Sequence, residues 1–161
     1  MRRNQHGELT RTKSMDYTEE TLVLIKPDAL ERGVTGEILR RLEAAGLRIR
    51  NLRWVRLSRA LLEQHYAELN AKNPRAFDRN TRYLVDKSAV ALVLTGVNAI
   101  GKVRLLIGPT DPSVAPPGTI RGDLSTDSIA FADSQDRGLG NLVHAADSRD
   151  SAKKEIALWF G

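Results

Sequence analysis

The chain has 161 residues, of which 41% are hydrophobic, and it carries a net charge of +5 but no cysteine. This size suits one domain whose core is large enough to fold without cross-links, and the absence of cysteine excludes disulfides, thiolate catalysis and cysteine-based zinc sites. The longest apolar run, residues 89–94, is too short to cross a bilayer, and no apolar stretch follows Arg2 and Arg3 as a secretory signal would require. We therefore expect a cytoplasmic protein.

The first 20 residues are polar and lack a hydrophobic period, so we expect a disordered arm ahead of a domain at residues 21–161. Residues 1–14 alone carry a net charge of +3, and Met15 offers an alternative start of the chain. A basic balance favours anionic partners such as nucleic acid. Most of the excess positive charge lies on the arm, however, only 5% of the residues are aromatic, and the sequence contains no nucleic-acid-binding motif. We therefore expect neither a specific nucleic acid nor a membrane as a partner.

The domain is expected to begin with a strand and a helix. Residues 21–26 form a continuous β-prone run, typical of a central strand, and Pro27 ends it. Apolar residues then recur at helical spacing over residues 34–45, with charged residues between them. Gly46 follows in the usual position after the C-terminus of a helix.

A strand, two helices and a second strand are expected next. Residues 47–57 alternate apolar residues with arginine or asparagine, which predicts a half-buried strand. Ser58 is placed to cap a helix over residues 59–69, and a second short helix is expected at residues 75–85. The apolar run at residues 88–95 predicts another buried strand.

The last part of the chain combines a helix, a long loop, a short strand and a final helix. Residues 98–106 predict the helix, and residues 109–140, rich in Pro, Gly, Asp and Ser, predict a loop of a length that is usually functional. Residues 142–145 predict the strand, and Ser148 is placed to cap a helix that runs to Trp159. Four strands with helices between them favour a ferredoxin-like α+β sandwich, a four-stranded antiparallel sheet with helices on its surface.

The chain has three histidines, of which His6 lies in the arm, His65 in a predicted helix and His144 in an apolar strand directly after the long loop. An imidazole keeps one unprotonated nitrogen near neutral pH, so it can accept a phosphoryl group and later release it. His144 is therefore a candidate nucleophile. A histidine buried in the core for structural reasons is the alternative interpretation.

Phosphoryl transfer also needs cations and hydrogen-bond donors around the transferred group. The candidates near strand ends and around the long loop are Lys26, Arg104, Thr110, Arg121 and Asn141. For each of them, a solvated position on the surface is the alternative. The sequence contains no glycine-rich phosphate-binding motif of the P-loop or Rossmann kind, so a phosphate site would have to be built differently.

Several segments, in the same order along the chain, resemble the nucleoside diphosphate kinase family. They lie at residues 26–28 (Lys-Pro-Asp), 31–33, 36–38, 65–66, 108–112, 117–123, 141–144 with 147–148, and 151–152 with 155–160. The resemblance covers about residues 20–160 and implies a ferredoxin-like fold. It also implies transfer of the terminal phosphoryl group from a nucleoside triphosphate to a nucleoside diphosphate, by a ping-pong mechanism through a phosphohistidine.

The resemblance assigns a role to each matched residue. His144 would be phosphorylated, and Glu155 would accept a hydrogen bond from its other ring nitrogen. Phe77 would stack on the base of the nucleotide. The phosphates and the sugar would be held by Lys26, Tyr66, Arg104, Thr110, Arg121 and Asn141. Magnesium would arrive with the nucleotide, with no residue of the chain as a metal ligand, and the protein would be a homo-oligomer, a hexamer rather than a tetramer.

The chain departs from the family's pattern in two places that bear on activity. An insertion of about ten residues lies around residues 124–137, between the matched Arg121 and His144. Ala146 stands where the family usually has serine, which predicts reduced turnover. These departures leave open an alternative, a weakly active or inactive nucleotide-binding regulatory module on the same fold. The retained charged residues argue for the active enzyme.

Overall fold

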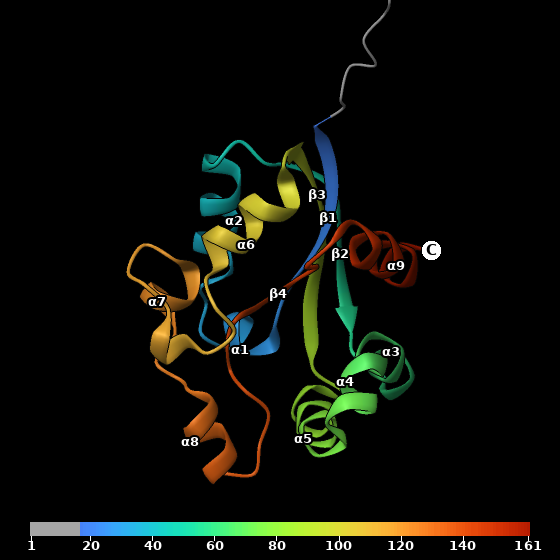
Figure 1. Cartoon of the computed structure of the whole chain (residues 1–161), viewed down its shortest axis with the longest axis vertical. Coiled ribbons are helices and arrows are strands. Elements are labelled where there is room, and N and C mark those ends of the chain that lie inside the picture. The colour runs from blue at the N-terminus through green and yellow to red at the C-terminus, as the bar shows by residue number, and fades with distance from the viewer. Residues whose placement is uncertain (1–16) are drawn as a thin grey trace, which may run out of the picture.

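The computed structural model describes residues 17–161 and confirms the ferredoxin-like arrangement (Figure 1). Within these residues, four antiparallel strands form one sheet in the order β2-β3-β1-β4. The strands are β1 (Thr18–Ile25), β2 (Arg48–Arg56), β3 (Ser88–Val97) and β4 (Val143–Ala145). β1 lies at the centre, paired with β3 on one side and with β4 on the other.

The longer helices lie where the sequence predicts them. In the described part of the chain the helices are α1 (Pro27–Glu31), α2 (Thr35–Ala44), α3 (Arg59–His65), α4 (Ala67–Lys72), α5 (Pro74–Leu84), α6 (Ala99–Ile107), α7 (Ile120–Leu124), α8 (Ile129–Ser134) and α9 (Arg149–Phe160). Ser58 accepts a hydrogen bond from the N–H of Leu61, and Ser148 from that of Ser151, so both predicted caps are confirmed. No helix among residues 17–161 has the length and apolar character needed to cross a membrane.

Helices cover both faces of the sheet. On one face, α2 and α6 contribute Ile38 and Val103 to a core cluster that contains Val23 of β1. On the other face, Trp159 of α9 packs in a cluster with Leu22. Successive side chains of a strand point to opposite faces, so β1 is buried on both sides. Figure 1 shows α2 and α6 on one side of the sheet and α9 on the other.

β2 forms an edge of the sheet and is more exposed than the half-buried strand we predicted. Within the described residues it pairs with β3 alone. Leu52 and Trp54 are 50% and 64% exposed. The alternation of side chains is present, but no further strand of the described chain lies beside β2.

The structure corrects several predicted boundaries. β1 begins at Thr18, so residues 18–20 belong to the sheet rather than to the arm, and residues 1–16 of the expected arm lie outside the described residues. The helix expected at residues 59–69 is divided into α3 and α4 because the chain turns at Tyr66, where φ is −100° and ψ is 20°. The long loop contains α7, α8 and a 3-10 turn, η1 (Pro112–Val114). These elements have three to six residues, too few to show a helical period.

Candidate active site

A cleft of about 700 Å³ contains nearly all of the residues that the sequence singles out. Its wall comes from α3, α4, α6, β4 and α9, and from the loops that precede β4. The predicted site residues in this wall are Lys26, Tyr66, Arg104, Thr110, Arg121, Asn141, His144 and Glu155. Lys26 directly follows β1, and His144 lies opposite Leu24 in the pairing of β4 with β1, so the centre of the sheet fixes both.

His144 is held by a carboxylate through one of its ring nitrogens. Its Nε2 lies 2.9 Å from Oε2 of Glu155 on α9, and the two side chains are 27% and 18% exposed. A carboxylate accepts hydrogen bonds, so this contact places the ring proton on Nε2. The lone pair is then on Nδ1, which is the arrangement a nucleophilic histidine needs.

The backbone is strained two residues before His144. Leu142 has a φ of 67°, in the left-handed region that non-glycine residues seldom adopt. Its N–H donates to Oδ2 of Asp28 at 2.8 Å, and its carbonyl accepts from the N–H of Lys26 at 2.8 Å. Strain of this kind persists only where the surroundings enforce it, and it is common at functional sites. The bend lets Asn141 and His144 line the same cleft.

Lys26 is a buried cation at the bottom of the cleft. Its side chain is 8% exposed, and Nζ donates to the carbonyl of Leu139 at 2.7 Å and to Oδ1 of Asn141 at 2.8 Å. Burial lowers the pKa of Lys26 to about 8, against the opposing effect of Asp28 and with a smaller contribution from Arg121. An anion in the cleft would stabilise the protonated form, so Lys26 is suited to bind phosphate.

Arg121 is 3% exposed and is largely committed to the protein itself. Four of its five N–H groups donate to the backbone carbonyls of Gly108, Pro109, Asn141 and Val143. Burial, together with Arg104, lowers its pKa to about 10. Arg121 therefore fixes the loop against β4 and adds a positive charge to the cleft wall.

The remaining predicted donors differ in their exposure to solvent. Arg104 is exposed on α6 and has no ion pair within residues 17–161, so its guanidinium is available to an anion. The carbonyl of Thr110 accepts from Nδ2 of Asn141 at 2.9 Å. Burial, with Glu155 nearby, raises the pKa of Tyr66 far above its usual range. Its hydroxyl is therefore a permanent hydrogen-bond donor.

Phe77 is the one predicted site residue that the structure does not place in the cleft. Phe77 is 9% exposed and lies on the buried face of α5. Phe77 lies on the same helical face as Thr81 and Leu84, at the spacing of a core-facing stripe. Stacking of Phe77 on a base is therefore not supported. The apolar side chains that do line the cleft in this region are those of Leu69 and Leu139.

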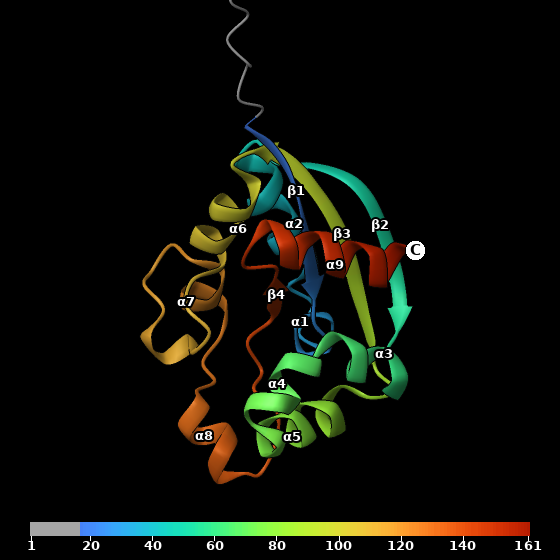
Figure 2. The same ribbon diagram turned by 45° about the vertical axis from the view of Figure 1, so that its right-hand side comes forward.

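The insertion at residues 124–137 folds against α5 instead of forming an open loop. Arg79 of α5, 12% exposed, forms an ion pair of 2.7 Å with Asp133 of α8. Asp127 accepts a hydrogen bond of 2.8 Å from the N–H of Gly140, next to the cleft residues. Figure 2 shows α8 and α5 at the same end of the molecule. The insertion thus shapes the segment that leads into the cleft, and residue spacing gave no sign of these contacts.

Among the described residues, one cluster of side chains and one single carboxylate are candidates for holding a metal ion. Ligand atoms of His65, His144 and Glu155 lie within 4.8 Å of one another. However, Nε1 of Trp159 donates to Nδ1 of His65 at 3.2 Å, which leaves the proton of His65 on Nε2. A protonated nitrogen has no lone pair for a metal, so hydrogen bonding suits this group better. Asp147 also lines the cleft with an exposed carboxylate, whose pKa is lowered by hydrogen bonds from Ser151 and Ser148.

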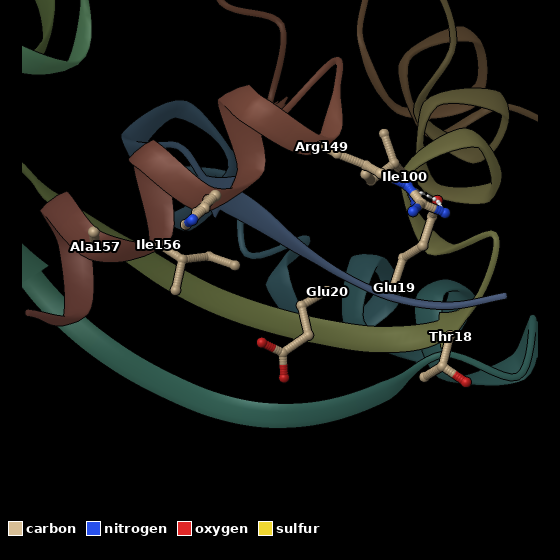
Figure 3. A pocket seen from close by; sticks show the side chains of 8 residues that line it. Thr18, Glu19, Glu20, Ile100, Arg149, Ile156 and Ala157 are labelled. Atoms are coloured by element: carbon tan, nitrogen blue, oxygen red, sulfur yellow. Dashed lines mark hydrogen bonds and ion pairs between the residues drawn. The ribbon is translucent and has the colours of Figure 1, made fainter. Parts of the chain in front are cut away.

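A second cavity, of about 380 Å³, lies between β1, α6 and α9 and contains none of the predicted site residues (Figure 3). Glu19 points toward Arg149 across it, and their ion pair is 2.8 Å long. Ile100 and Ile156 supply an apolar part of its wall. The cations and the histidine needed for phosphoryl transfer are gathered in the larger cleft.

The chain is similar to the nucleoside diphosphate kinases. The model of the family "Nucleoside diphosphate kinase" matches residues 19–161. The chain is 47% identical to the nucleoside diphosphate kinase of Rubrobacter xylanophilus over 143 residues, which cover 89% of this chain and 98% of the relative. It is 40% identical to the nucleoside diphosphate kinase of Helianthus annuus, with 88% of each protein covered.

Solved structures give the same result. The nucleoside diphosphate kinase of Borrelia burgdorferi, a transition-state mimic with bound vanadate and ADP, superposes with a TM-score of 0.87 at 29% identity. The match covers 90% of this chain and 88% of that one. The Halobacterium salinarum enzyme, in complex with CDP, superposes with a TM-score of 0.76 at 36% identity, covering 88% and 87% of the two chains.

Proposed function

Because the chain belongs to the nucleoside diphosphate kinase family, we propose that His144 is the residue that carries the phosphoryl group in its reaction. The reaction moves the terminal phosphoryl group of a nucleoside triphosphate to a nucleoside diphosphate. The contact between Nε2 of His144 and Glu155, 2.9 Å long, supports this assignment. It directs the lone pair of Nδ1 away from the carboxylate, in a cleft lined by cations.

In the first half of the proposed reaction, Nδ1 attacks the terminal phosphorus of the triphosphate. The bond from that phosphorus to the bridging oxygen breaks, the diphosphate leaves with the electron pair, and a phosphoryl group remains on Nδ1. The imidazole gains positive charge as the new bond forms, and Glu155 stabilises this charge through Nε2–H. In the second half, a different diphosphate attacks the phosphohistidine and regenerates the neutral ring.

The other residues of the cleft divide the binding of the nucleotide between them. Lys26 and Arg104 are placed to neutralise phosphate oxygens, because one is buried at the bottom of the cleft and the other is exposed on its wall. Arg121 adds charge from behind the loop. Thr110, Asn141 and the hydroxyl of Tyr66 add hydrogen-bond donors for the phosphates and the sugar.

Phosphoryl transfer by this family generally needs a divalent metal ion, and we propose magnesium, bound with the nucleotide. Magnesium prefers oxygen ligands and keeps several of its waters. Asp147, the exposed carboxylate in the cleft, fits such a hydrated ion and would hold it. The ion supplies charge neutralisation on the phosphates during transfer.

Base selectivity is proposed to be weak. Leu69 of α4 and Leu139 of the loop before β4 are half-buried apolar side chains in the cleft wall. Apolar contacts of this kind accept the face of any base, whereas strong discrimination requires hydrogen bonds to the base edge. We expect purine and pyrimidine diphosphates to be accepted alike.

The regulatory-module alternative is not favoured, since the relatives at good identity and coverage are named as kinases. We further propose a homo-oligomer, a hexamer rather than a tetramer, located in the cytoplasm. The exposed Leu52 and Trp54 on the edge strand β2 support self-association, because an open strand edge with apolar side chains is a favourable surface for pairing.

The assignment of His144 is tested by incubating the protein with ATP and magnesium in the absence of an acceptor. We expect one acid-labile phosphoryl group per chain, which added CDP removes. His144→Ala should abolish the labelling, whereas His6→Ala, a histidine change in the arm, should leave it intact. Labelling that survives in the His144→Ala protein would show that another residue carries the phosphoryl group.

A further inference from the structure

His65 connects a buried tryptophan with the proposed nucleophile. It is the last residue of α3 and lines the cleft. Nε1 of Trp159 donates to its Nδ1 at 3.2 Å, and Trp159 is 3% exposed. The ring of His65 stands nearly perpendicular to that of His144, with an interplanar angle of 83° and 4.5 Å between centroids. None of the roles assigned above includes His65 or Trp159.

The hydrogen bond from Trp159 fixes the tautomer of His65. An indole N–H is a donor only, so Nδ1 of His65 has to accept, and the ring proton lies on Nε2. Burial, with a smaller effect of His144, holds the pKa of His65 well below its usual range. His65 is therefore a neutral ring with one defined orientation.

The buried Nε2–H of His65 destabilises the fold, and packing alone does not explain why it is present. Nε2 of His65 is buried and has no hydrogen-bond partner within the described residues. Unpartnered buried donors are rare, and each one calls for an explanation such as a functional role. A phenylalanine would remove this buried Nε2–H, but it would leave the buried indole N–H of Trp159 without its acceptor.

His144 needs a second contact to fix its ring. The hydrogen bond to Glu155 restrains one nitrogen, but the imidazole can still rotate about the direction of that bond. A perpendicular ring at 4.5 Å blocks this rotation. In-line attack on phosphorus tolerates little misorientation, because small displacements of reacting groups lower rates by large factors.

We propose that His65, held by Trp159, is a positioning residue that fixes the plane of the His144 imidazole so that Nδ1 faces the bound phosphate. This inference rests on the proposed role of His144. Glu155 holds the proton of His144 on Nε2, and His65 sets the orientation of the His144 ring. A neutral His65 also adds no positive charge beside His144.

The test compares two tryptophan changes that remove the same N–H donor at different places. Trp159→Phe keeps a ring in the core and removes the donor to His65. Trp54→Phe changes an exposed tryptophan on β2, away from the cleft, and is the matched control, because phenylalanine keeps an apolar ring on the surface proposed for self-association. The intact protein is phosphorylated with ATP and magnesium in single turnovers. We expect Trp159→Phe to lower the maximal rate about threefold and His65→Ala about tenfold. The half-saturating ATP concentration should change less than twofold, and Trp54→Phe should match the unchanged protein.

Nitrogen-15 NMR of the imidazoles tests the tautomer of His65 on which the proposal depends, whereas the maximal rate at a constant half-saturating ATP concentration separates positioning from a structural role. In the unchanged protein, His65 is expected to be neutral with its proton on Nε2 at pH 7. In Trp159→Phe its signals should shift toward a mixture of the two tautomers. If His65→Ala does not fold, Trp159→Phe still decides the question, because it preserves the size and the apolar character of the buried ring.

Three results would overturn the proposal. The first is an unchanged maximal rate in Trp159→Phe together with an unchanged rate in His65→Ala. The second is a raised half-saturating ATP concentration at a constant maximal rate, which would make His65 part of the binding wall only. The third is a His65 that is cationic, or protonated on Nδ1, in the unchanged protein. In each case His144 would still be labelled, so failure of this proposal is distinct from failure of the proposed function.

Discussion

Replacement of Glu155 by glutamine tests how the site stabilises the charge that develops on His144. The carboxylate oxygen lies 2.9 Å from Nε2, and the glutamate side chain is 18% exposed. Two unit charges about 4 Å apart interact by about 4 kcal/mol at an effective dielectric constant of 20. If about half of a charge has formed on the imidazole in the transition state, Glu155→Gln should raise the barrier by about 2 kcal/mol. That corresponds to roughly a 30-fold slower phosphorylation.

The assay is single-turnover phosphorylation by ATP and magnesium in rapid quench. Glu155→Gln is compared with Glu43→Gln, a change of the same kind at an exposed position of α2. The maximal rate should fall in Glu155→Gln while the half-saturating ATP concentration stays nearly constant, since Glu155 contacts the nucleophile and not the nucleotide. A Glu155→Gln rate within twofold of the unchanged protein would refute the view that this carboxylate stabilises the developing charge.

Three further predictions follow from burial in and near the cleft. Burial lowers the pKa of Lys26 to about 8, so between pH 8 and about 10.5 this residue binds fewer protons in the folded than in the unfolded protein. The free energy of unfolding of the nucleotide-free protein should therefore rise with pH over that range. A pH series of urea unfolding checks this, and the same rise in Lys26→Met would contradict it. Phe77→Ala should reduce the free energy of unfolding by about 3–5 kcal/mol, because a buried ring is lost, with the ratio of activity on ADP to that on CDP unchanged. A changed ratio of these two activities would indicate that Phe77 contacts the base of the nucleotide. Ala146→Ser should lower the free energy of unfolding by about 1–3 kcal/mol, because it buries a hydroxyl beside Ile100 and Ala152. Turnover should stay within twofold, and a clear rise would show that the hydroxyl reaches the catalytic residues.

The elements predicted best are those whose signal is local. The runs in β1 and β3 are continuous because both faces of these strands are buried, and the caps at Ser58 and Ser148 act within one turn of their helices. α1, α7 and α8 have five or six residues, so their apolar positions do not repeat often enough to show a period. The extension of β1 to Thr18 depends on pairing with Val97 of β3, which the polar sequence at that end does not reveal.

The chemistry of the site was more predictable than its detailed packing. Lys26 and His144 were found from residue types, and Glu155 from the resemblance to the family. The structure brings all three into one cleft. Phe77 shows the limit, because a shift of one position along α5 decides whether a ring faces the core or the nucleotide. The contact between His65 and Trp159 joins residues 94 positions apart, so no local sequence pattern predicts it.

The alanine at position 146 illustrates how position in the fold changes the meaning of a substitution. From the sequence, the missing serine predicts reduced turnover through a lost hydrogen bond near the nucleophile. In the structure, Ala145 and Asp147 line the cleft, whereas Ala146 is 1% exposed and packs in an apolar cluster with Ile100 and Ala152. Ala152 belongs to α9, the helix that carries Glu155. Ala146 therefore packs against the helix that carries Glu155, and we expect it to influence turnover, if at all, through this packing and not through a hydrogen bond to the nucleophile.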